Sequence, residues 1–421
     1  MATGLGAGRQ AQGVVGLLDI GASKTVCVIV AVPRLGRRLE DVHVLGTGVQ
    51  PSRGLRDGLV VELDEAEQAV RAAVAQAERA AGVRVETVLV AVACGEPESR
   101  RFTANTRVEG RVVEESDIAR MMRGARTYAE RDGRALLHMN CISYSLDSAA
   151  GIADPLGLAG NALSADLHAI TTEEAPLSNL LQVIERAYLT PAVVVPAAYA
   201  SALAATTEAE RGQGVLAVDI GAGATTFAVF SAGHLLASGL VPMGGNHVTR
   251  DLAHALSAPA FEAERIKREY GSLARAAGDL HEEVLYAQAG GTMPMLSQTT
   301  RGCISEIVRD RMADLLGRVA QSIERSEVGG QAVQGLVLTG GVAQQAGLGE
   351  LAADIFARPV RVSRVEPLDG MPGEFAGPAF ATAAGLVRVA LDPAAGMRLG
   401  RDGTGPSGYL GRMGQWLRES F

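Results

Sequence analysis

The sequence predicts an α/β fold built from two related domains, and three observations lead to this prediction. The chain has 421 residues, which is more than one hydrophobic core normally serves. A segment near the start, residues 16–30, returns in similar form at residues 216–230, one copy in each half of the chain. A third segment, residues 335–356, has the pattern of a strand, a glycine pair and a helix.

The composition excludes several classes of protein. Apolar residues make up 47% of the chain and charged residues 20%, as in ordinary soluble α/β proteins. The net charge of −8 argues against a nucleic-acid partner, because phosphate backbones attract basic surfaces. The apolar run at residues 26–32 is too short for a signal peptide or a membrane span. The widely spaced cysteines Cys27, Cys94, Cys141 and Cys303 indicate a reducing cytoplasm rather than a zinc site or disulfides.

The duplicated segment predicts two β-hairpins. Residues 16–30 read GLLDIGASKTVCVIV and residues 216–230 read LAVDIGAGATTFAVF, so Asp19 and Gly21 coincide with Asp219 and Gly221. Small residues in such a turn let backbone N–H groups approach a phosphate, and an aspartate at the strand end holds a hydrated Mg²⁺ beside it. The alternative is that each glycine only serves a tight turn, but two copies in register favour the phosphate site.

The third segment predicts another binding element. An apolar strand runs into Gly340 and Gly341 and is followed by a helical pattern, so the junction offers N–H groups and a positive dipole to an anion or a nucleoside. The chain has no GxxxxGK[ST] motif, which excludes a Walker-type NTPase.

Lysine usage points to the same kind of ligand. Among 39 basic residues only Lys24 and Lys267 are lysines, and Lys24 lies in the first hairpin. Glu264 and Lys267 are three apart on a predicted helix and share one face. A compact ammonium suits a phosphate or a ribose hydroxyl better than a guanidinium does. The alternative, two ordinary surface lysines, stays open.

The two hairpins and the strand–glycine–helix junction resemble those of the actin, Hsp70 and sugar-kinase superfamily, whose two domains close over a nucleotide. Within it, the chain resembles the FtsA family of bacterial cell-division proteins over residues 12–421. The blocks that carry this resemblance are PSRGLRDGLVVEL at 51–63, DPLGLAG at 154–160, EAERIKREYG at 262–271, LVLTGGVAQQAGL at 336–348 and WLRESF at 416–421, together with the second hairpin.

The resemblance implies an actin-like core in which an unrelated subdomain, 1C (SHS2-like), replaces actin subdomain 1B at a different place. The implied divisions are 12–83 and 166–205 for subdomain 1A, 84–165 for 1C, 206–242 and 312–391 for 2A, 243–311 for 2B, 392–408 for a flexible linker and 409–421 for a terminal helix. The strand VETVLVAVAC is expected to open the 1C insert.

The resemblance also implies an ATP site with Mg²⁺ held through water by Asp19 and Asp219. The implied ligand-contacting residues are Asp19, Gly21, Ser23 and Lys24 in the first phosphate loop, Asp219, Gly221, Gly223 and Thr225 in the second, Glu264 and Lys267 at the ribose, and Gly340 and Gly341 at the adenosine. Thr226 stands where many relatives carry an acidic residue. We therefore expect ATP to act as a conformational ligand and the chain to be at most a weak ATPase.

The last thirteen residues predict an amphipathic helix. At 100° per residue one face of about 140° carries the apolar side chains and the other carries the polar ones. The apolar side chains are Tyr409, Leu410, Met413, Trp416, Leu417 and Phe421, and the polar face includes Arg412, Gln415, Arg418 and Glu419. A helix of about 20 Å is too short to span the bilayer and would lie in its interface, with both arginines at anionic lipid. The alternative is docking on its own domain, but the Gly- and Pro-rich tether at 392–408 favours the membrane.

The resemblance supplies partners and a location. It implies self-assembly into filaments, contact with other divisome proteins, and binding of the FtsZ C-terminal peptide to subdomain 2B, where Arg301 could pair with an acidic peptide. An ordinary solvated arginine is the alternative for Arg301. The implied location is peripheral, on the cytoplasmic face of the inner membrane at the division septum.

Three rival classes remain at this stage. A sugar or acetate kinase would need a general base in the cleft and has no use for the terminal helix. An Hsp70-type chaperone would need a peptide-binding domain, for which nothing after residue 391 is long enough. A pilus-associated actin homologue does not account for the terminal helix or for the block at 51–63.

Overall fold

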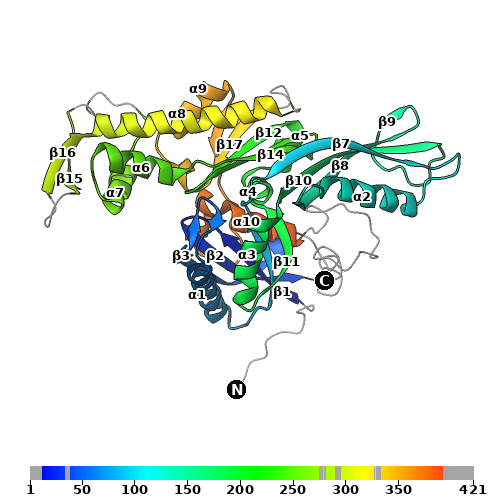
Figure 1. Ribbon diagram of the computed structural model, residues 1–421, viewed down its shortest axis with the longest axis horizontal. Coiled ribbons are helices and arrows are strands. Elements are labelled where there is room, and N and C mark those ends of the chain that lie inside the picture. The colour runs from blue at the N-terminus through cyan, green and yellow to red at the C-terminus, as the bar shows by residue number, and fades with distance from the viewer. Residues whose placement is uncertain are drawn as a thin grey trace, which may run out of the picture.

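The computed structural model describes residues 12–33, 38–274, 278, 281–289, 295–326, 328 and 333–391. Two five-stranded sheets form the centre of the molecule, and a four-stranded sheet extends to one side (Figure 1). A helical arm that ends in a small two-stranded sheet extends to the other side (Figure 1). Across this described part of the chain, no helix has both the length and the apolar character that crossing a membrane requires.

The first central sheet contains the first predicted hairpin. Its strands, in spatial order, are β11 (Thr190–Pro196), β6 (Thr87–Val92), β1 (Gln12–Ile20), β2 (Lys24–Pro33) and β3 (His43–Pro51). The helices α1 (Leu63–Ala81) and α3 (Glu174–Arg186) lie on one face of this sheet. Each has an apolar side, and α1 buries alanines and valines at helical spacing against Leu18 and Ile29. Gly48 permits this close packing, since a Cβ on it would lie 2.0 Å from the Ala73 carbonyl oxygen. The smaller elements η1 (Leu39–Asp41), β4 (Leu55–Arg56) and β5 (Leu59–Val60) complete this part.

The insert is a separate sheet with one helix on it. Its strands, in spatial order, are β7 (Glu98–Arg107), β10 (Ala162–Glu173), β8 (Arg134–Leu146) and β9 (Ala149–Ile152), and α2 (Glu115–Ala129) packs on β7 and β8. Two expected limits of the insert differ from this arrangement. The strand expected to open it is β6, which pairs in parallel with β1 and β11 in the first central sheet. The expected limit at residue 165 falls inside β10, whose pairing with β8 continues to Glu173.

The second central sheet contains the second predicted hairpin. Its strands, in spatial order, are β14 (His234–Val241), β13 (Thr225–Ser231), β12 (Val215–Ile220), β17 (Gly335–Thr339) and β18 (Val360–Val362). On one face of this sheet, apolar side chains form a hydrophobic core with residues of α8 (Arg301–Arg325) and α9 (Leu348–Phe356). The arm adds α6 (Gly245–Ala255), α7 (Ala260–Tyr270), β15 (Glu283–Gln288) and β16 (Met295–Thr300). The expected limit between residues 311 and 312 lies within α8, which is one continuous helix.

Two helices pack between the central sheets and connect them. They are α4 (Ala197–Ala205), which contacts β12 and β13, and α10 (Ala381–Leu391), which contacts β1, β2 and β6. The two helices touch at Gly385, where a Cβ would lie 1.7 Å from the Ala200 carbonyl oxygen. Since α10 is apolar on nearly every side, its sequence suits a helix buried all round.

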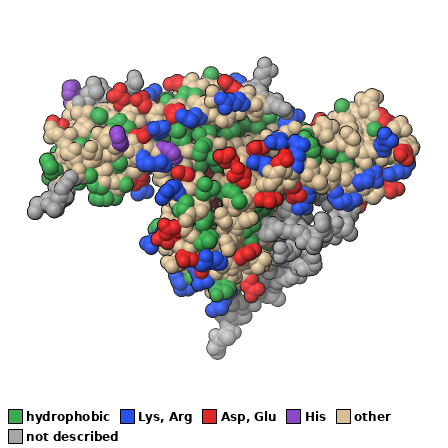
Figure 2. All heavy atoms as spheres, viewed as in Figure 1, with side chains coloured by type: hydrophobic (Ala, Val, Ile, Leu, Met, Phe, Trp, Pro, Cys, Tyr) green, Lys and Arg blue, Asp and Glu red, His purple; other side chains and the backbone are tan. Residues whose placement is uncertain are grey.

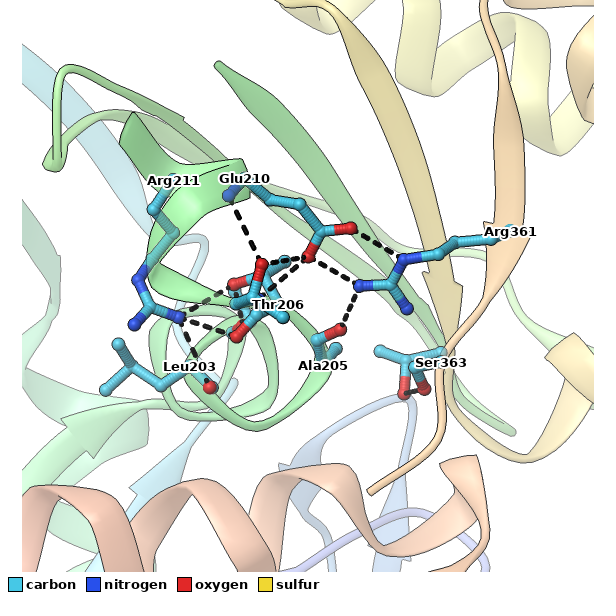
Figure 3. Close-up of polar contacts among 10 residues, drawn as sticks. Leu203, Ala205, Thr206, Glu210, Arg211, Arg361 and Ser363 are labelled. Atoms are coloured by element: carbon cyan, nitrogen blue, oxygen red, sulfur yellow. Dashed lines mark hydrogen bonds and ion pairs between the residues drawn. The ribbon is translucent and has the colours of Figure 1, made fainter. Parts of the chain in front are cut away.

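A polar cluster fixes the chain where it leaves α4 and enters α5 (Glu208–Gln213) (Figure 3). Arg361 donates to the Ala205 carbonyl at 2.8 Å and to the Glu210 carboxylate at 2.7 Å (Figure 3). Arg211 donates to the Thr206 carbonyl at 2.7 Å, so it satisfies a backbone group at the end of α4. The passage from the first central sheet to the second is thus held by charge-assisted hydrogen bonds.

Candidate functional site

The two predicted hairpins are confirmed, and they share one register. In the first, Asp19 pairs with Val26 and Ile20 with Thr25, while in the second Asp219 pairs with Thr226 and Ile220 with Thr225. The Gly21 N–H donates to the Lys24 carbonyl at 3.0 Å, and the Gly221 N–H donates to the Ala224 carbonyl at the same distance. The duplication is therefore structural as well as sequential.

The tips of the two hairpins meet. A Cβ on Gly223 would lie 2.8 Å from the Ala22 Cβ and 3.4 Å from the Asp57 Cα. Glycine at position 223 is what allows this approach, since any larger residue would push the tips apart. The first tip is also tied to its own sheet, where the Ser52 N–H donates to the Ser23 carbonyl at 3.1 Å.

Asp19 and Asp219 lie near the ends of equivalent strands, and the charge of Asp219 acts on Asp19. Burial raises the pKa of Asp19 to about 7, the charge of Asp219 adds to the rise, and Lys24 opposes it. Burial also raises the pKa of Asp219, against hydrogen bonds from the Ser201 and Thr382 hydroxyls and the charge of Lys24. One lysine thus stands beside two carboxylates, and a further cation would favour their ionised forms.

This pair fits a hydrated Mg²⁺. Among the described residues no group of three or more His, Cys, Asp or Glu side chains is placed to hold a metal by itself. Mg²⁺ commonly keeps several waters and binds one or two carboxylates together with substrate phosphates. Asp19 and Asp219 supply that number of carboxylates.

Glu264 and Lys267 lie together on α7, as their spacing predicts. The Lys267 ammonium is buried and bonds to the Glu264 carboxylate at 2.5 Å, the Thr249 hydroxyl at 2.8 Å and the Gly245 carbonyl at 3.1 Å. These three acceptors match the three donors of a lysine ammonium, so Glu264 is the more accessible of the two predicted ribose contacts. The Gly245 N–H donates to the Gly221 carbonyl at 2.9 Å, which joins this pair to the second hairpin.

Gly340 lies directly against the Asp219 carboxylate. Its φ is +86°, and a Cβ on it would lie 2.3 Å from Oδ1 of Asp219. The helix predicted after the glycine pair is present as α9, but it does not follow the pair directly, because Gly341 opens only η3 (Gly341–Gln344), a 3-10 turn. The longer helix α9 begins at Leu348, after Gly347 turns with φ +81° against the backbone of Ala274.

The sequence reasoning missed a segment that joins these parts. The Pro378 carbonyl in η5 (Pro378–Phe380) accepts from the Gly340 N–H at 3.0 Å and from the Thr339 hydroxyl at 3.2 Å. Two residues beyond η5, the Thr382 hydroxyl donates to the Asp219 carboxylate at 3.2 Å. The only signal for this segment in the sequence is that it precedes the apolar run of α10. Neighbouring residues in the sequence do not reveal that the segment contacts Thr339, Gly340 and Asp219. The turn η4 (Gly373–Ala376) precedes it.

Of the remaining predicted residues, Thr225 lies in the second hairpin and Arg301 lies on the arm. Arg301 is the first residue of α8, directly after β16 on the arm (Figure 1), and it pairs with Glu282 at 2.9 Å. The membrane-facing residues predicted at 409–421 and the tether at 392–408 lie outside the described residues. Thr225 opens β13 and donates to the Met243 carbonyl at 2.8 Å.

Two central sheets with in-register hairpins and helices crossing between them define an actin-like fold. Solved structures agree: a PilM–PilN type IV pilus biogenesis complex matches with a TM-score of 0.64 and 19% identity, over 91% of this chain and 99% of that one. MreB5 of Spiroplasma citri bound to ADP matches with a TM-score of 0.53 and 15% identity, over 90% and 96% of the two chains.

Closer relatives define the family. The sequence profile of "Cell division protein FtsA" matches residues 216–385, and that of the "SHS2 domain inserted in FTSA" matches residues 95–171. The chain is 37% identical to the cell division protein FtsA of Agrobacterium fabrum and 38% to that of Rhizobium meliloti, in each case over 97% of this chain and 95% of the relative. It is 30% identical to FtsA of Escherichia coli K12, over 96% of this chain and 97% of that one. The chain belongs to the FtsA family of cell-division proteins. This membership does not favour the two alternatives, a small-molecule kinase and a pilus-associated actin homologue.

Proposed function

We propose that the chain binds ATP with Mg²⁺ between its two hairpins. The observation that carries this proposal is the matched register of the hairpins, which brings Asp19 and Asp219 to equivalent strand ends beside Lys24. The actin-like MreB5 of Spiroplasma citri has been solved with ADP and with AMPPNP, which supports a nucleotide ligand for this fold. The tips touch at Ala22 and Gly223, so a polyphosphate enters only if they separate.

In this proposal ATP changes the conformation and is hydrolysed weakly at most. Thr226 pairs with Asp219 in the sheet and offers a hydroxyl where the resemblance led us to expect a carboxylate. A hydroxyl at neutral pH does not act as a general base without an activating partner. A movement that separates or closes the tips would also move the two central sheets relative to each other, because each hairpin is part of one sheet.

We propose further that the chain assembles head to tail. Exposed apolar side chains lie at both ends of its long axis, and hydrophobic atoms are visible at the β15–β16 end (Figure 2). At that end they are Phe261, Leu285, Met295 and Leu296, and on the insert they are Val112, Leu156 and Leu158. Two different patches that join repeatedly give an open filament rather than a closed dimer.

The predicted terminal helix would fix such a filament to the membrane. Its six apolar side chains give a gross stabilisation on the order of 6 to 10 kcal/mol, which is reduced by the cost of ordering a short helix. A single copy would therefore bind reversibly, while a row of copies gains residence by avidity. The proposed location is the cytoplasmic face of the inner membrane at the septum.

The proposed cargo is the C-terminal peptide of FtsZ, bound on the arm near Arg301, with other divisome proteins meeting the insert. Arg301 already pairs with Glu282 at 2.9 Å. A carboxylate of an acidic peptide would have to replace Glu282 in this pair. Arginine suits such a peptide because its guanidinium commonly forms two parallel hydrogen bonds with one carboxylate.

Sedimentation with anionic liposomes tests the function as a whole. The full chain with MgATP should sediment with the liposomes and should carry an FtsZ C-terminal peptide with it. A variant that ends at Gly408 should still bind ATP but stay in the supernatant. Liposome binding by that variant equal to that of the full chain would contradict the anchor.

A further inference from the structure

The ammonium of Lys24 rests on an aromatic ring rather than on an acceptor. Its Nζ lies 3.4 Å from the centroid of the Phe380 ring. The side chain is half-buried, and within the described part of the chain no oxygen accepts a hydrogen bond from it. A lysine ammonium has three donors, so Lys24 keeps donors for an incoming anion at the foot of the first hairpin tip.

The Phe380 ring is itself held firmly. It packs against Phe375 with the ring centroids 4.3 Å apart, and Phe375 is only 1% exposed in the core shared by both sheets. The carbonyl at the start of the same turn, that of Pro378, accepts from Gly340 N–H. The ring therefore cannot follow the lysine if the lysine moves, and it acts as a fixed platform.

Two carboxylates compete with this platform for the ammonium. The charges of Asp19 and Asp219 both act on Lys24, yet neither forms an ion pair with it in the described structure. A lysine side chain is long and flexible, so without the ring its ammonium would move toward these carboxylates. There it would occupy the place of a cation and would no longer face a phosphate.

We propose that Phe380 is a positioning residue that keeps the Lys24 ammonium away from the aspartate pair and directed at the phosphates of the nucleotide. This inference rests on the proposed nucleotide site, and it makes Phe380 a residue that determines how tightly that site binds a polyphosphate. A cation–π contact of this kind corresponds to about a fivefold change in affinity. The effect should grow with the number of phosphates and be absent for adenosine.

The first test observes the contact without nucleotide. Because the chain has only two lysines, labelling with ¹³C-lysine gives two ε-methylene signals, and Lys24→Met identifies one of them. The Lys24 signal should carry an upfield ring-current shift that Phe380→Leu removes and Phe380→Tyr retains. A Lys24 signal that does not respond to Phe380→Leu would overturn the inference.

The second test measures dissociation constants for ATP, ADP and adenosine in the same variants. Phe380→Leu should weaken ATP binding about fivefold and leave adenosine unchanged, while Phe380→Tyr restores ATP affinity. In the Lys24→Met background Phe380→Leu should have no further effect. Equal weakening for all three ligands, or the same loss without Lys24, overturns this inference alone. Absence of ATP binding by the unsubstituted chain overturns the proposed function, and this inference with it.

Discussion

Asp19 and Asp219 lie near the ends of equivalent strands on different sheets, and the pKa of Asp19 is raised first by burial and then by the charge of Asp219. Each belongs to a strand that ends in the same kind of glycine turn, so the repeat in the sequence produces a charged pair in space. Like charges held close together favour a cation between them or a proton on one of them. The proposed nucleotide site therefore depends on both halves of the chain.

Asp19→Asn should weaken MgATP binding at least about tenfold, because it removes one of the two carboxylates that we propose hold the hydrated metal. The loss should be much smaller for ATP in EDTA. Calorimetric titration with and without Mg²⁺ measures both. Asp41→Asn, on the exposed turn η1, is the matched control and should bind as the unsubstituted chain does. An equal loss in both buffers would show that Asp19 does not act through the metal.

Gly223→Ala should disturb the contact between the tips, because the added Cβ would lie 2.8 Å from that of Ala22. We expect a loss of stability of about 1 to 3 kcal/mol, as for other overpacked contacts. The double variant Ala22→Gly with Gly223→Ala should recover most of the loss, since it removes the opposing methyl group. Urea unfolding midpoints of the unsubstituted chain, the two single variants and the double variant give a double-mutant cycle. If the stability losses of the two single variants simply add in the double variant, the two residues are not in direct contact.

Gly385→Ala should be among the most damaging single changes, because its Cβ would lie 1.7 Å from the Ala200 carbonyl oxygen and would force α4 and α10 apart. Gly349→Ala is the control, since that glycine lies inside α9 and a Cβ there meets nothing within 4 Å. The control should be neutral or stabilising by about 0.5 to 1 kcal/mol. Thermal unfolding of both variants gives the comparison. A Gly385→Ala variant as stable as the Gly349→Ala variant would refute the close crossing.

Acid should weaken the contact between the insert and the second sheet through His168. Burial first, then the charges of His138 and Arg101, lower the pKa of His168 to about 3, while its ring bonds to the Ser99 hydroxyl at 2.7 Å and to Asn140 at 3.2 Å. Ser99 in turn accepts from the Ser238 N–H of β14 at 3.0 Å.

The sign of this pH effect follows from linkage. Below the ordinary histidine pKa of about 6.5 the unfolded chain takes up a proton that folded His168 refuses, so the free energy of unfolding decreases by about 1.4 kcal/mol for each unit by which the pH is lowered. Above about pH 6.5 the residue contributes no pH dependence. Urea midpoints from pH 7 to 5 should fall less steeply for His168→Gln than for the exposed control His254→Gln. Identical slopes would contradict the assignment.

The sequence predicted what local pattern encodes and missed what depends on distant packing. The hairpins and the Glu264–Lys267 pair follow from spacing within short segments, and the structure confirms both. Phe380 and Thr382 could not be placed, because their contacts with Lys24 and Asp219 arise only when α10 crosses back to the first sheet.

The strand β6 shows the same limit. Its apolar run predicted a buried strand correctly, but not the sheet to which the strand belongs. The helix expected after Gly341 is present, but it starts only at Leu348 for a related reason. Ala274, which lies far from Gly347 in the sequence, packs against Gly347 and interrupts the segment.

Hydrogen exchange with and without MgATP is the decisive measurement for a nucleotide held between the hairpins, because it reports on both hairpins in one experiment. If the nucleotide lies between the hairpins, amides of residues 20–24 and 220–225 should become protected together, and Asp19→Asn should lower the protection of both segments. Protection of only one tip, or of neither at ATP concentrations that saturate the chain, would contradict a nucleotide held between the two.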